Sequence, residues 1–182
     1  MTQAALPEAL DRYAVRHPAE ADVVARFRAL LAAREDCFER RCTEPGHITG
    51  SAWILSPQED AVLLTHHRKL DLWVQLGGHA DGDADTHRVA LREGVEESGI
   101  EPLVSYDAAT PFDLDIHLIP ARRDEPAHEH FDVRYAFRAA HRAFTVTEES
   151  HDLAWVALDD LAGVTDDESV LRMARKWRDR GR

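Results

Sequence analysis

The chain has 182 residues and carries 34 Asp and Glu against 22 Lys and Arg, so its formal net charge is −12. Hydrophobic residues make up 44% and charged residues 31% of the sequence, which is typical of a folded, water-soluble domain and excludes a disordered or fibrous chain. The acidic balance argues against a nucleic-acid polymer as partner, because phosphate backbones recruit an excess of Lys and Arg, but it suits a metal cation or a small phosphate held through a metal.

Two helices are predicted before Pro45. Apolar residues on one face indicate a short helix at residues 6–16 and a longer one at about 19–40, whose other face is filled by Arg and Glu. The Pro45-Gly46 pair ends this segment. We therefore expect residues 1–45 to form an N-terminal helical extension, which is a candidate either for packing on the domain or for a homodimer contact.

The remaining residues, 46–182, have the pattern of a mixed α and β domain. Short apolar runs bounded by turn residues predict strands at 48–55, 61–66, 72–75, 102–106, 112–119, 131–139 and 153–157. Helical spacing predicts helices at about 86–98, ending at Gly99, and at about 167–178. The order shows no regular βαβ alternation, so we expect an α+β or α/β/α layered domain with a mixed sheet.

The location of the protein is predicted from three features of the sequence. No apolar run approaches the roughly 18 residues of a membrane span, and the N-terminus lacks the basic, apolar and small-residue order of a secretory signal. Cys37 and Cys42, placed in the second helix and at its end, are too few for a disulfide framework, so we expect reduced thiols. We therefore predict a cytoplasmic protein that does not associate with membranes.

The stretch from Gly78 to Ile100 contains a cluster of carboxylates suited to a metal ion. Glu93, Glu96 and Glu97 are spaced i, i+3 and i+4 on a predicted helix, so they share one face with Cβ atoms roughly 5–6 Å apart. Three like charges this close repel, and a divalent cation such as Mg²⁺, which prefers carboxylate oxygen, removes the conflict. Glutamate-rich helix faces are usually just solvated, so the spacing alone favours the solvated face.

Neighbouring residues make the arrangement more specific. Arg92 can orient a carboxylate through a bidentate bond. The Gly77-Gly78 pair permits a tight turn whose backbone carbonyls can face a metal. The whole arrangement is a Gly-Gly turn, an acidic loop and then Arg-Glu-x-x-Glu-Glu-x-Gly-apolar at fixed spacing, and this combination favours a metal site over a solvated face.

This arrangement resembles the Nudix box, whose pattern is Gly, five residues, Glu, seven residues, Arg-Glu-apolar-x-Glu-Glu-x-Gly-apolar. The positions that match the pattern are Gly78, Arg92, Glu93, Glu96, Glu97, Gly99 and Ile100. Outside the box the resemblance is looser and spans about residues 47–162, and the run QLGGHADGDAD is similar to a bacterial Nudix subgroup of poorly defined substrate. The resemblance implies a Nudix-like α/β/α fold.

Three positions depart from the box. Ala84 stands in the place of its first glutamate, with Asp83 and Asp85 on either side as candidate substitutes. Gly94 occupies an apolar slot, where a glycine inside a helix costs about 0.5–1 kcal/mol relative to alanine and removes a core contact. Leu76 stands where a proline often precedes the glycine pair. We expect the loss of the first glutamate to affect the rate more than the family assignment.

The resemblance implies a pyrophosphohydrolase that uses Mg²⁺ or Mn²⁺ on a small substrate linked to a nucleoside diphosphate. Its implied metal ligands are Glu93, Glu96, Glu97 and a backbone carbonyl of Gly77 or Gly78. In the same scheme Glu93 or Glu97 orients or deprotonates the attacking water, and Arg92 fixes the carboxylates. An acidic site can take an anionic diphosphate only through a bridging metal.

A further acid from a late loop is often recruited in the Nudix family. The candidates here are Glu148, Glu149 and Asp152. For each of them taken singly, a solvated acidic loop is slightly favoured over a catalytic role.

Histidines and aspartates alternate on two predicted strands, with Asp113, Asp115 and His117 on one and His128, His130 and Asp132 on the other. If the strands pair, the residues form a polar cluster, which would be a substrate-binding surface, a second metal site or the ordinary water-facing side of a half-buried sheet. The water-facing side is favoured over a metal site, and substrate binding by His128 and His130 is left open. His79, next to the glycine pair, is a candidate phosphate contact, with loop capping as its alternative.

Two other functions are compatible with the sequence. A non-catalytic ligand-binding module on the Nudix fold is favoured by Ala84 and Gly94 and disfavoured by the intact glutamates. An enzyme like isopentenyl diphosphate isomerase shares the fold but needs a reactive cysteine in its site. Cys37 and Cys42 both lie in the N-terminal extension, which argues against this second alternative.

Overall fold

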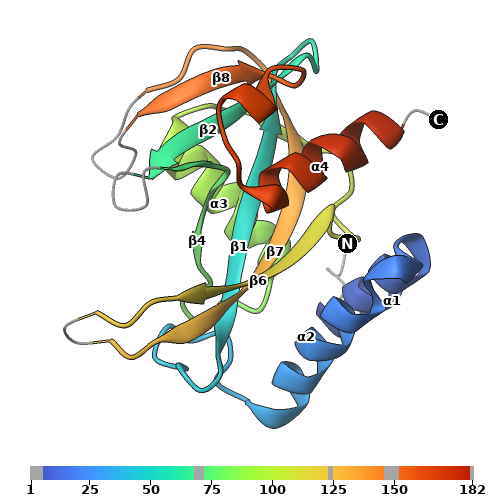
Figure 1. The fold of residues 1–182 in the computed structure, drawn as a ribbon, viewed down its shortest axis with the longest axis vertical. Coiled ribbons are helices and arrows are strands. Elements are labelled where there is room, and N and C mark those ends of the chain that lie inside the picture. Colours follow the sequence, from blue (N-terminus) through green and yellow to red (C-terminus); the bar gives the residue numbers. More distant parts are fainter. Residues whose placement is uncertain (1–5, 68–71, 123–124, 146–151, 181–182) are drawn as a thin grey trace. The chain divides into compact units, whose positions relative to one another are not determined.

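The computed structural model describes residues 6–67, 72–122, 125–145 and 152–180 (Figure 1). The chain divides into two compact units. The first unit comprises Met1–Ser51, Gly78–Ala90 and Asp107–Tyr135, and the second comprises Ala52–Gly77, Leu91–Tyr106 and Ala136–Arg182. In the described residues no helix combines the length and the apolar character that crossing a membrane requires.

The described strands form one sheet of eight. They are β1 (Gly46–Leu55), β2 (Ala61–His67), β3 (Leu72–Val74), β4 (Leu76–His79), β5 (Leu103–Ser105), β6 (Asp113–Ile119), β7 (His128–Ala139) and β8 (Leu153–Ala157). The strand order is β3-β2-β1-β7-β5, with β4 paired to β1, β6 to β7 and β8 to β2. Strands β1, β4 and β7 each contribute residues to both units.

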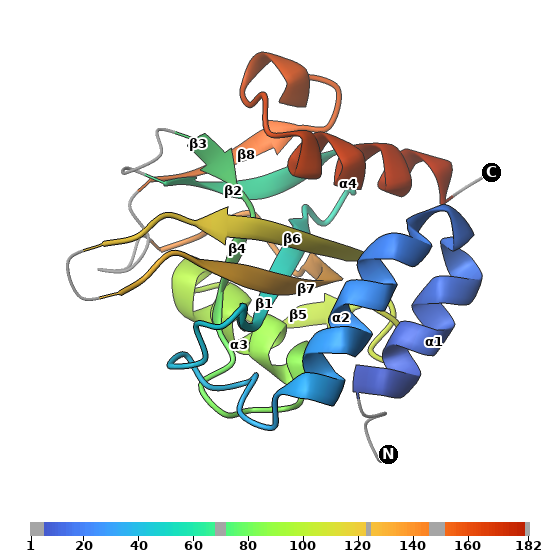
Figure 2. The ribbon, with the colours of Figure 1, turned by 60° about the horizontal axis from the view of Figure 1, so that its bottom comes forward.

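The N-terminal helices belong to the first unit. Helix α1 (Leu6–Arg16), the short helix η1 (Pro18–Glu20) and α2 (Ala21–Ala33) precede β1, and Figure 2 shows α1 and α2 side by side with α2 next to β6. The hydroxyl of Tyr13 donates to Glu20 at 2.5 Å and accepts from the Leu114 amide at 3.2 Å. Phe27 packs edge-on against Phe131, with ring centroids 5.3 Å apart. The extension is therefore part of the core of this unit.

The second unit is built around β2. This strand pairs antiparallel with β8 and with β3, and Ile54 of β1 lies opposite its Leu63. Helix α4 (Glu168–Asp179) buries Val170, Met173 and Ala174, and the Asp167 side chain caps it by accepting from two backbone amides. The last residues of α3 (Thr86–Ser98) belong to this unit as well.

The α+β class with N-terminal helices is confirmed, together with most predicted elements, but two predictions about local structure are wrong. The second helix ends at Ala33 rather than near residue 40, because Arg34 is extended and its guanidinium pairs with Asp36. Cys37 accordingly lies in a turn, and Cys42 lies just after one. The Gly77-Gly78 pair forms no tight turn, since both residues lie in strand β4.

Candidate active site

Helix α3 carries the acidic residues of the candidate site, and its two ends explain why it forms where it does. At the N-terminus the Asp85 carboxylate accepts the Arg88 amide at 3.0 Å, which satisfies a backbone donor that the first turn leaves unpaired. At the C-terminus Gly99 has a φ of +66°, a left-handed backbone conformation that ends the helix. Glycine adopts this conformation without the steric strain that a Cβ would cause.

Arg92 holds two of the three glutamates. Its Nη2 lies 2.8 Å from Glu93 Oε1, and its Nε lies 3.9 Å from Glu96 Oε2. The Glu93 side chain is 14% exposed, whereas that of Glu96 is 54% exposed. The guanidinium therefore binds a half-buried carboxylate and lies close to a solvent-facing one. The orienting role of Arg92 in catalysis stays a prediction.

Glu97 is held by a different element. Its Oε2 accepts the backbone N–H of Gly77 at 3.2 Å, so strand β4 meets the last turn of α3 within the second unit. The contact that Gly77 makes is thus through its amide nitrogen. A metal contact through the carbonyl of Gly77 or Gly78 stays a prediction.

The chemistry of this donor set fits a hard divalent cation. Glu93 and Glu97 are half-buried carboxylates held by a guanidinium and by a backbone amide, and Glu96 adds a third carboxylate one turn from Glu93. Carboxylate oxygens of this kind are the ligands that Mg²⁺ and Mn²⁺ prefer in proteins. The three glutamates are the residues that would hold such an ion.

Both acids that flank Ala84 already have structural roles. Arg88 binds Asp83 through Nε at 2.7 Å and Nη2 at 2.6 Å, and Asp85 caps α3. Ala84 itself is exposed. These contacts disfavour Asp83 and Asp85 as substitutes for the missing box glutamate.

Gly94 has a packing role that corrects the interpretation drawn from the sequence. A Cβ at this position would lie 2.9 Å from Ala52 Cβ and 3.2 and 3.3 Å from methyl carbons of Leu103 and Ile54. The helix lies so close to the strands of its unit that there is no room for a side chain. Gly94 therefore allows close packing of the helix in the core rather than removing a core contact. It no longer favours a non-catalytic binding module.

The late acids are only partly covered by the structure. Glu148 and Glu149 lie outside the described residues. The Asp152 side chain is exposed, and its backbone carbonyl accepts the His66 amide at 2.8 Å. A catalytic role for any of the three stays a prediction.

The predicted pairing of the two histidine- and aspartate-bearing strands is confirmed, since Asp115 lies opposite Asp132 and His117 opposite His130. The expectation that this face is exposed to water is wrong at Asp132 and His128, which are buried, whereas His117 is exposed. Asp132 accepts hydrogen bonds there from Arg134 and from hydroxyl groups of β1.

Arg134 is the residue that sequence reasoning missed. It is 2% exposed, and its nitrogens lie 3.2 Å from Asp113, 3.2 Å from Asp115 and 2.7 Å from Asp132. Burial lowers the pKa of its guanidinium, but the three carboxylates outweigh burial and raise it overall. The alternation of the strand contained the signal, because Arg134 follows Asp132 by two residues and so shares its face.

Two of the histidines predicted to bind substrate, His79 and His130, lie next to each other with ring centroids 5.3 Å apart. The third, His128, lies 5.3 Å from His130. A further ring, that of His47, is 5.2 Å from His79 and 4.8 Å from His130, and no pattern in the sequence selects it.

A comparison of the sequence with models of protein families identifies the family. The NUDIX domain model matches residues 46–175, which is most of the chain. The chain therefore belongs to the Nudix family of hydrolases, as predicted from the box. No curated protein matches the chain.

Solved structures with the same fold include three enzymes. A Nudix-family hydrolase from Clostridium perfringens is 21% identical, with a TM-score of 0.58, and the match covers 72% of this chain and 96% of that one. The Ap4A hydrolase of C. elegans is 18% identical, with a TM-score of 0.54 and coverage of 72% and 94%. The dihydroneopterin triphosphate pyrophosphohydrolase of E. coli is 16% identical, with a TM-score of 0.55 and coverage of 71% and 92%. At these identities the likeness establishes the fold.

Proposed function

We propose that the protein hydrolyses a phosphoanhydride bond in a small nucleoside-diphosphate-linked substrate and depends on Mg²⁺ or Mn²⁺. The observation that carries the proposal is the pair of half-buried carboxylates on α3, Glu93 held by Arg92 and Glu97 held by the Gly77 amide. Membership of the Nudix family and the substrates named for the similar structures, a dinucleoside polyphosphate and a nucleotide-like triphosphate, support the substrate class.

Each residue of the candidate site has a defined task in this reaction. Glu93, Glu96 and Glu97 hold the cation, which, when bound, neutralises the diphosphate and polarises its phosphoryl oxygens. Glu93 or Glu97 orients the attacking water and accepts its proton. Arg92 keeps the Glu93 carboxylate in one orientation, so it is a positioning residue. The charges of the glutamates would repel an anionic substrate without the cation.

The structure weakens the two alternative functions, a non-catalytic binding module and an isomerase. Gly94 supports close packing, so Ala84 alone now favours a non-catalytic binding module. An isomerase with a reactive cysteine is disfavoured, because Cys37 and Cys42 are both buried and burial raises the pKa of the Cys37 thiol to about 11. The cytoplasmic location and a homodimer stay predictions.

The proposal is tested by incubating the protein with Mg²⁺ or Mn²⁺ and a panel of compounds, and by separating the phosphate-containing products. The panel contains nucleotide sugars, dinucleoside polyphosphates, NAD-like compounds, nucleoside triphosphates and prenyl diphosphates. We expect cleavage of a pyrophosphate bond in a nucleoside-diphosphate-linked member. Failure to cleave any member with either metal would favour the binding module.

The assignment of the site is tested by Glu97→Gln, which keeps the size of the side chain and removes its charge. We expect a loss of rate of about 100-fold or more, as for the removal of a catalytic acid–base group. The matched control is Glu35→Gln, an exposed glutamate in the turns after α2. A normal rate for Glu97→Gln in a protein that does cleave the substrate would show that the site lies elsewhere.

A further inference from the structure

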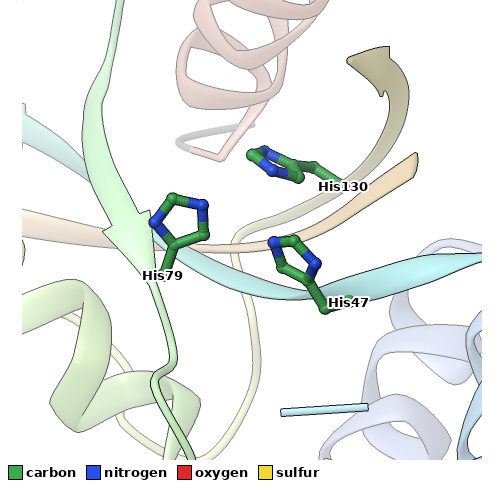
Figure 3. Close-up of side chains that lie close together, drawn as sticks. All are labelled: His47, His79 and His130. Atoms are coloured by element: carbon green, nitrogen blue, oxygen red, sulfur yellow. The ribbon is translucent and has the colours of Figure 1, made fainter. Parts of the chain in front are cut away.

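Three histidines of the first unit approach one another from three strands. His47 lies on β1, His79 on β4 and His130 on β7, and Figure 3 shows their side chains close together. One ring nitrogen of each lies within 4.8 Å of those of the other two. Nitrogens that bind one Zn²⁺ at about 2.0–2.1 Å lie roughly 3–3.5 Å apart, so small rotations of the rings would bring all three onto one ion.

The protonation of His47 prepares it to be a ligand. Its side chain is fully buried, and its Nδ1 lies 3.0 Å from the carbonyl oxygen of Cys42. A carbonyl oxygen can only accept, so Nδ1 carries the proton and Nε2 presents its lone pair. Among the described residues Nε2 has no hydrogen-bond partner. A buried nitrogen without a partner is costly, and a backbone carbonyl on the opposite nitrogen is the usual support of a metal-binding histidine.

The other two rings are also neutral near pH 7. Burial lowers the pKa of His79 to about 4, with Arg40 and His47 adding to the effect. Burial and the neighbouring histidines lower the pKa of His130 to about 2. The neutral imidazole is the form that binds metal.

We propose that His47, His79 and His130 form a binding site for a divalent transition-metal ion of the Zn²⁺ class. Imidazole nitrogen is a preferred donor for Zn²⁺, Ni²⁺ and Cu²⁺, whereas Mg²⁺ prefers oxygen. The site therefore differs from the glutamates of α3 both in its ligands and in its metal. A bound ion links β1, β4 and β7 within the first unit.

A fourth histidine, His128, packs against this site. Its ring stacks on that of His47 at a centroid distance of 4.9 Å. Its Nδ1 lies 2.9 Å from the carbonyl oxygen of Pro126, and its Nε2, which has no hydrogen-bond partner among the described residues, lies 4.0 Å from Glu125 Oε1. The arrangement repeats the one at His47. His128 therefore packs beside the three histidines that form the site.

The experiment measures metal binding rather than hydrolysis, so its outcome is independent of the proposed catalytic activity. Full-length protein without an affinity tag is freed of metal with a chelator and titrated with Zn²⁺ in the presence of excess Mg²⁺. We expect one Zn²⁺ per chain at the site and a rise in the denaturation midpoint. His79→Gln and His130→Gln should each weaken binding by more than about 100-fold, since changes outside the ligands alone cost about 10–100-fold.

Two control variants separate this site from its surroundings. His117→Gln changes an exposed ring 5.4 Å from His130 that is not one of the three, and should keep Zn²⁺ binding. Glu97→Gln changes the α3 site and should also keep it. Absence of Zn²⁺ binding to the wild type, normal binding by both histidine variants, or loss of binding in Glu97→Gln would each overturn the proposal.

A second measurement covers the case in which the histidine variants fail to fold, as judged by circular dichroism. Co²⁺ is then added to the wild-type protein in place of Zn²⁺. An absorption spectrum of nitrogen-ligated Co²⁺ of low coordination number supports the proposal. A spectrum of six-coordinate Co²⁺ with oxygen ligands overturns it.

Discussion

The guanidinium of Arg92 lies 2.8 Å from the carboxylate of its neighbour Glu93, although consecutive residues on a helix point in different directions. The contact is possible because the long arginine side chain folds back, and its Nε lies 3.3 Å from the same oxygen. Two charge-assisted contacts from one guanidinium hold this oxygen in place. The position of Glu93 thus depends on Arg92.

Replacing Arg92 by alanine should lower kcat by about 10–100-fold, as for other residues that orient a metal ligand. It should also raise the Mg²⁺ concentration needed for half-maximal rate, because Glu93 no longer has a fixed orientation. Arg92→Lys should recover only part of the rate, since an ammonium lacks the planar fork of arginine. Rates are measured as a function of Mg²⁺ concentration at saturating substrate.

The control for this prediction is Arg175→Ala, which breaks an exposed pair of Arg175 with Glu168 on α4. Surface pairs contribute at most about 1 kcal/mol, so this variant should keep both the rate and its Mg²⁺ dependence. An unchanged Mg²⁺ dependence in Arg92→Ala would mean that Arg92 acts only on the stability of the helix.

Gly94→Val should destabilise the protein by about 1–3 kcal/mol, the usual cost of overpacking. The added Cβ would lie 2.9 Å from Ala52 Cβ. Neither the backbone of α3 nor the Ala52 methyl group can move away easily. Urea denaturation measures the loss. Gly163→Ala is the control, because nothing lies within 4 Å of its Cβ position, and it should change stability by less than about 0.5 kcal/mol. Equal effects of the two substitutions would contradict the close packing at Gly94.

The sequence predicts α3 well because its periodicity and its glycine stop are both local signals. The same reasoning fails at Gly94, since the short distance from α3 to Ala52 is a tertiary feature that no local pattern records. It fails again at the Gly77-Gly78 pair. Turn propensity favours a turn there, but pairing with β1 places both glycines in a strand.

The candidate sites differ in how far they can be predicted. The α3 glutamates lie within five residues of one another, so helix geometry alone places them on one face. The histidine site draws on residues 47, 79 and 130, and only the sheet pairing brings three distant strands together. Alternation along β7 identifies His130 as one member, but no spacing in the sequence connects it with His47.

Arg134→Met should lower the free energy of unfolding by about 3–5 kcal/mol at pH 7, because it leaves Asp113, Asp115 and Asp132 close together without their cation. Without Arg134, burial and mutual repulsion favour the protonated form of these carboxyl groups in the folded variant. A group whose folded pKa is raised loses stability as the pH rises through that pKa. The difference in the free energy of unfolding between the wild type and Arg134→Met should therefore shrink as the pH falls toward 5.

The control for this substitution is Arg26→Met, which removes a pair with Glu129 that is largely exposed on the arginine side. It should cost no more than about 1 kcal/mol and show no such dependence on pH. Denaturation curves at several pH values give both results. A cost for Arg134→Met that stays constant between pH 5 and pH 8 would contradict the role of Arg134 as the shared cation.

His87 should make the protein less stable in mild acid. Its ring is buried edge-on against Tyr135, with centroids 5.0 Å apart. Burial lowers its pKa below the ordinary value of 6.5, against the opposite effect of Asp85 and Asp107. A histidine with a lowered folded pKa takes up its proton more readily in the unfolded chain. Its contribution to stability is therefore complete above about pH 6.5 and is lost as the pH falls toward the folded pKa.

His87→Phe keeps the contact between the two rings and removes the titrating group. With metal removed by a chelator, the wild-type free energy of unfolding should fall more steeply than that of His87→Phe as the pH falls from 7 to 5. Between pH 7.5 and 8.5 the difference between the two proteins should be constant, because His87 is then neutral in both states, and this range serves as the internal control. A difference that also stays constant down to pH 5 would contradict the inference that His87 is buried in its neutral form.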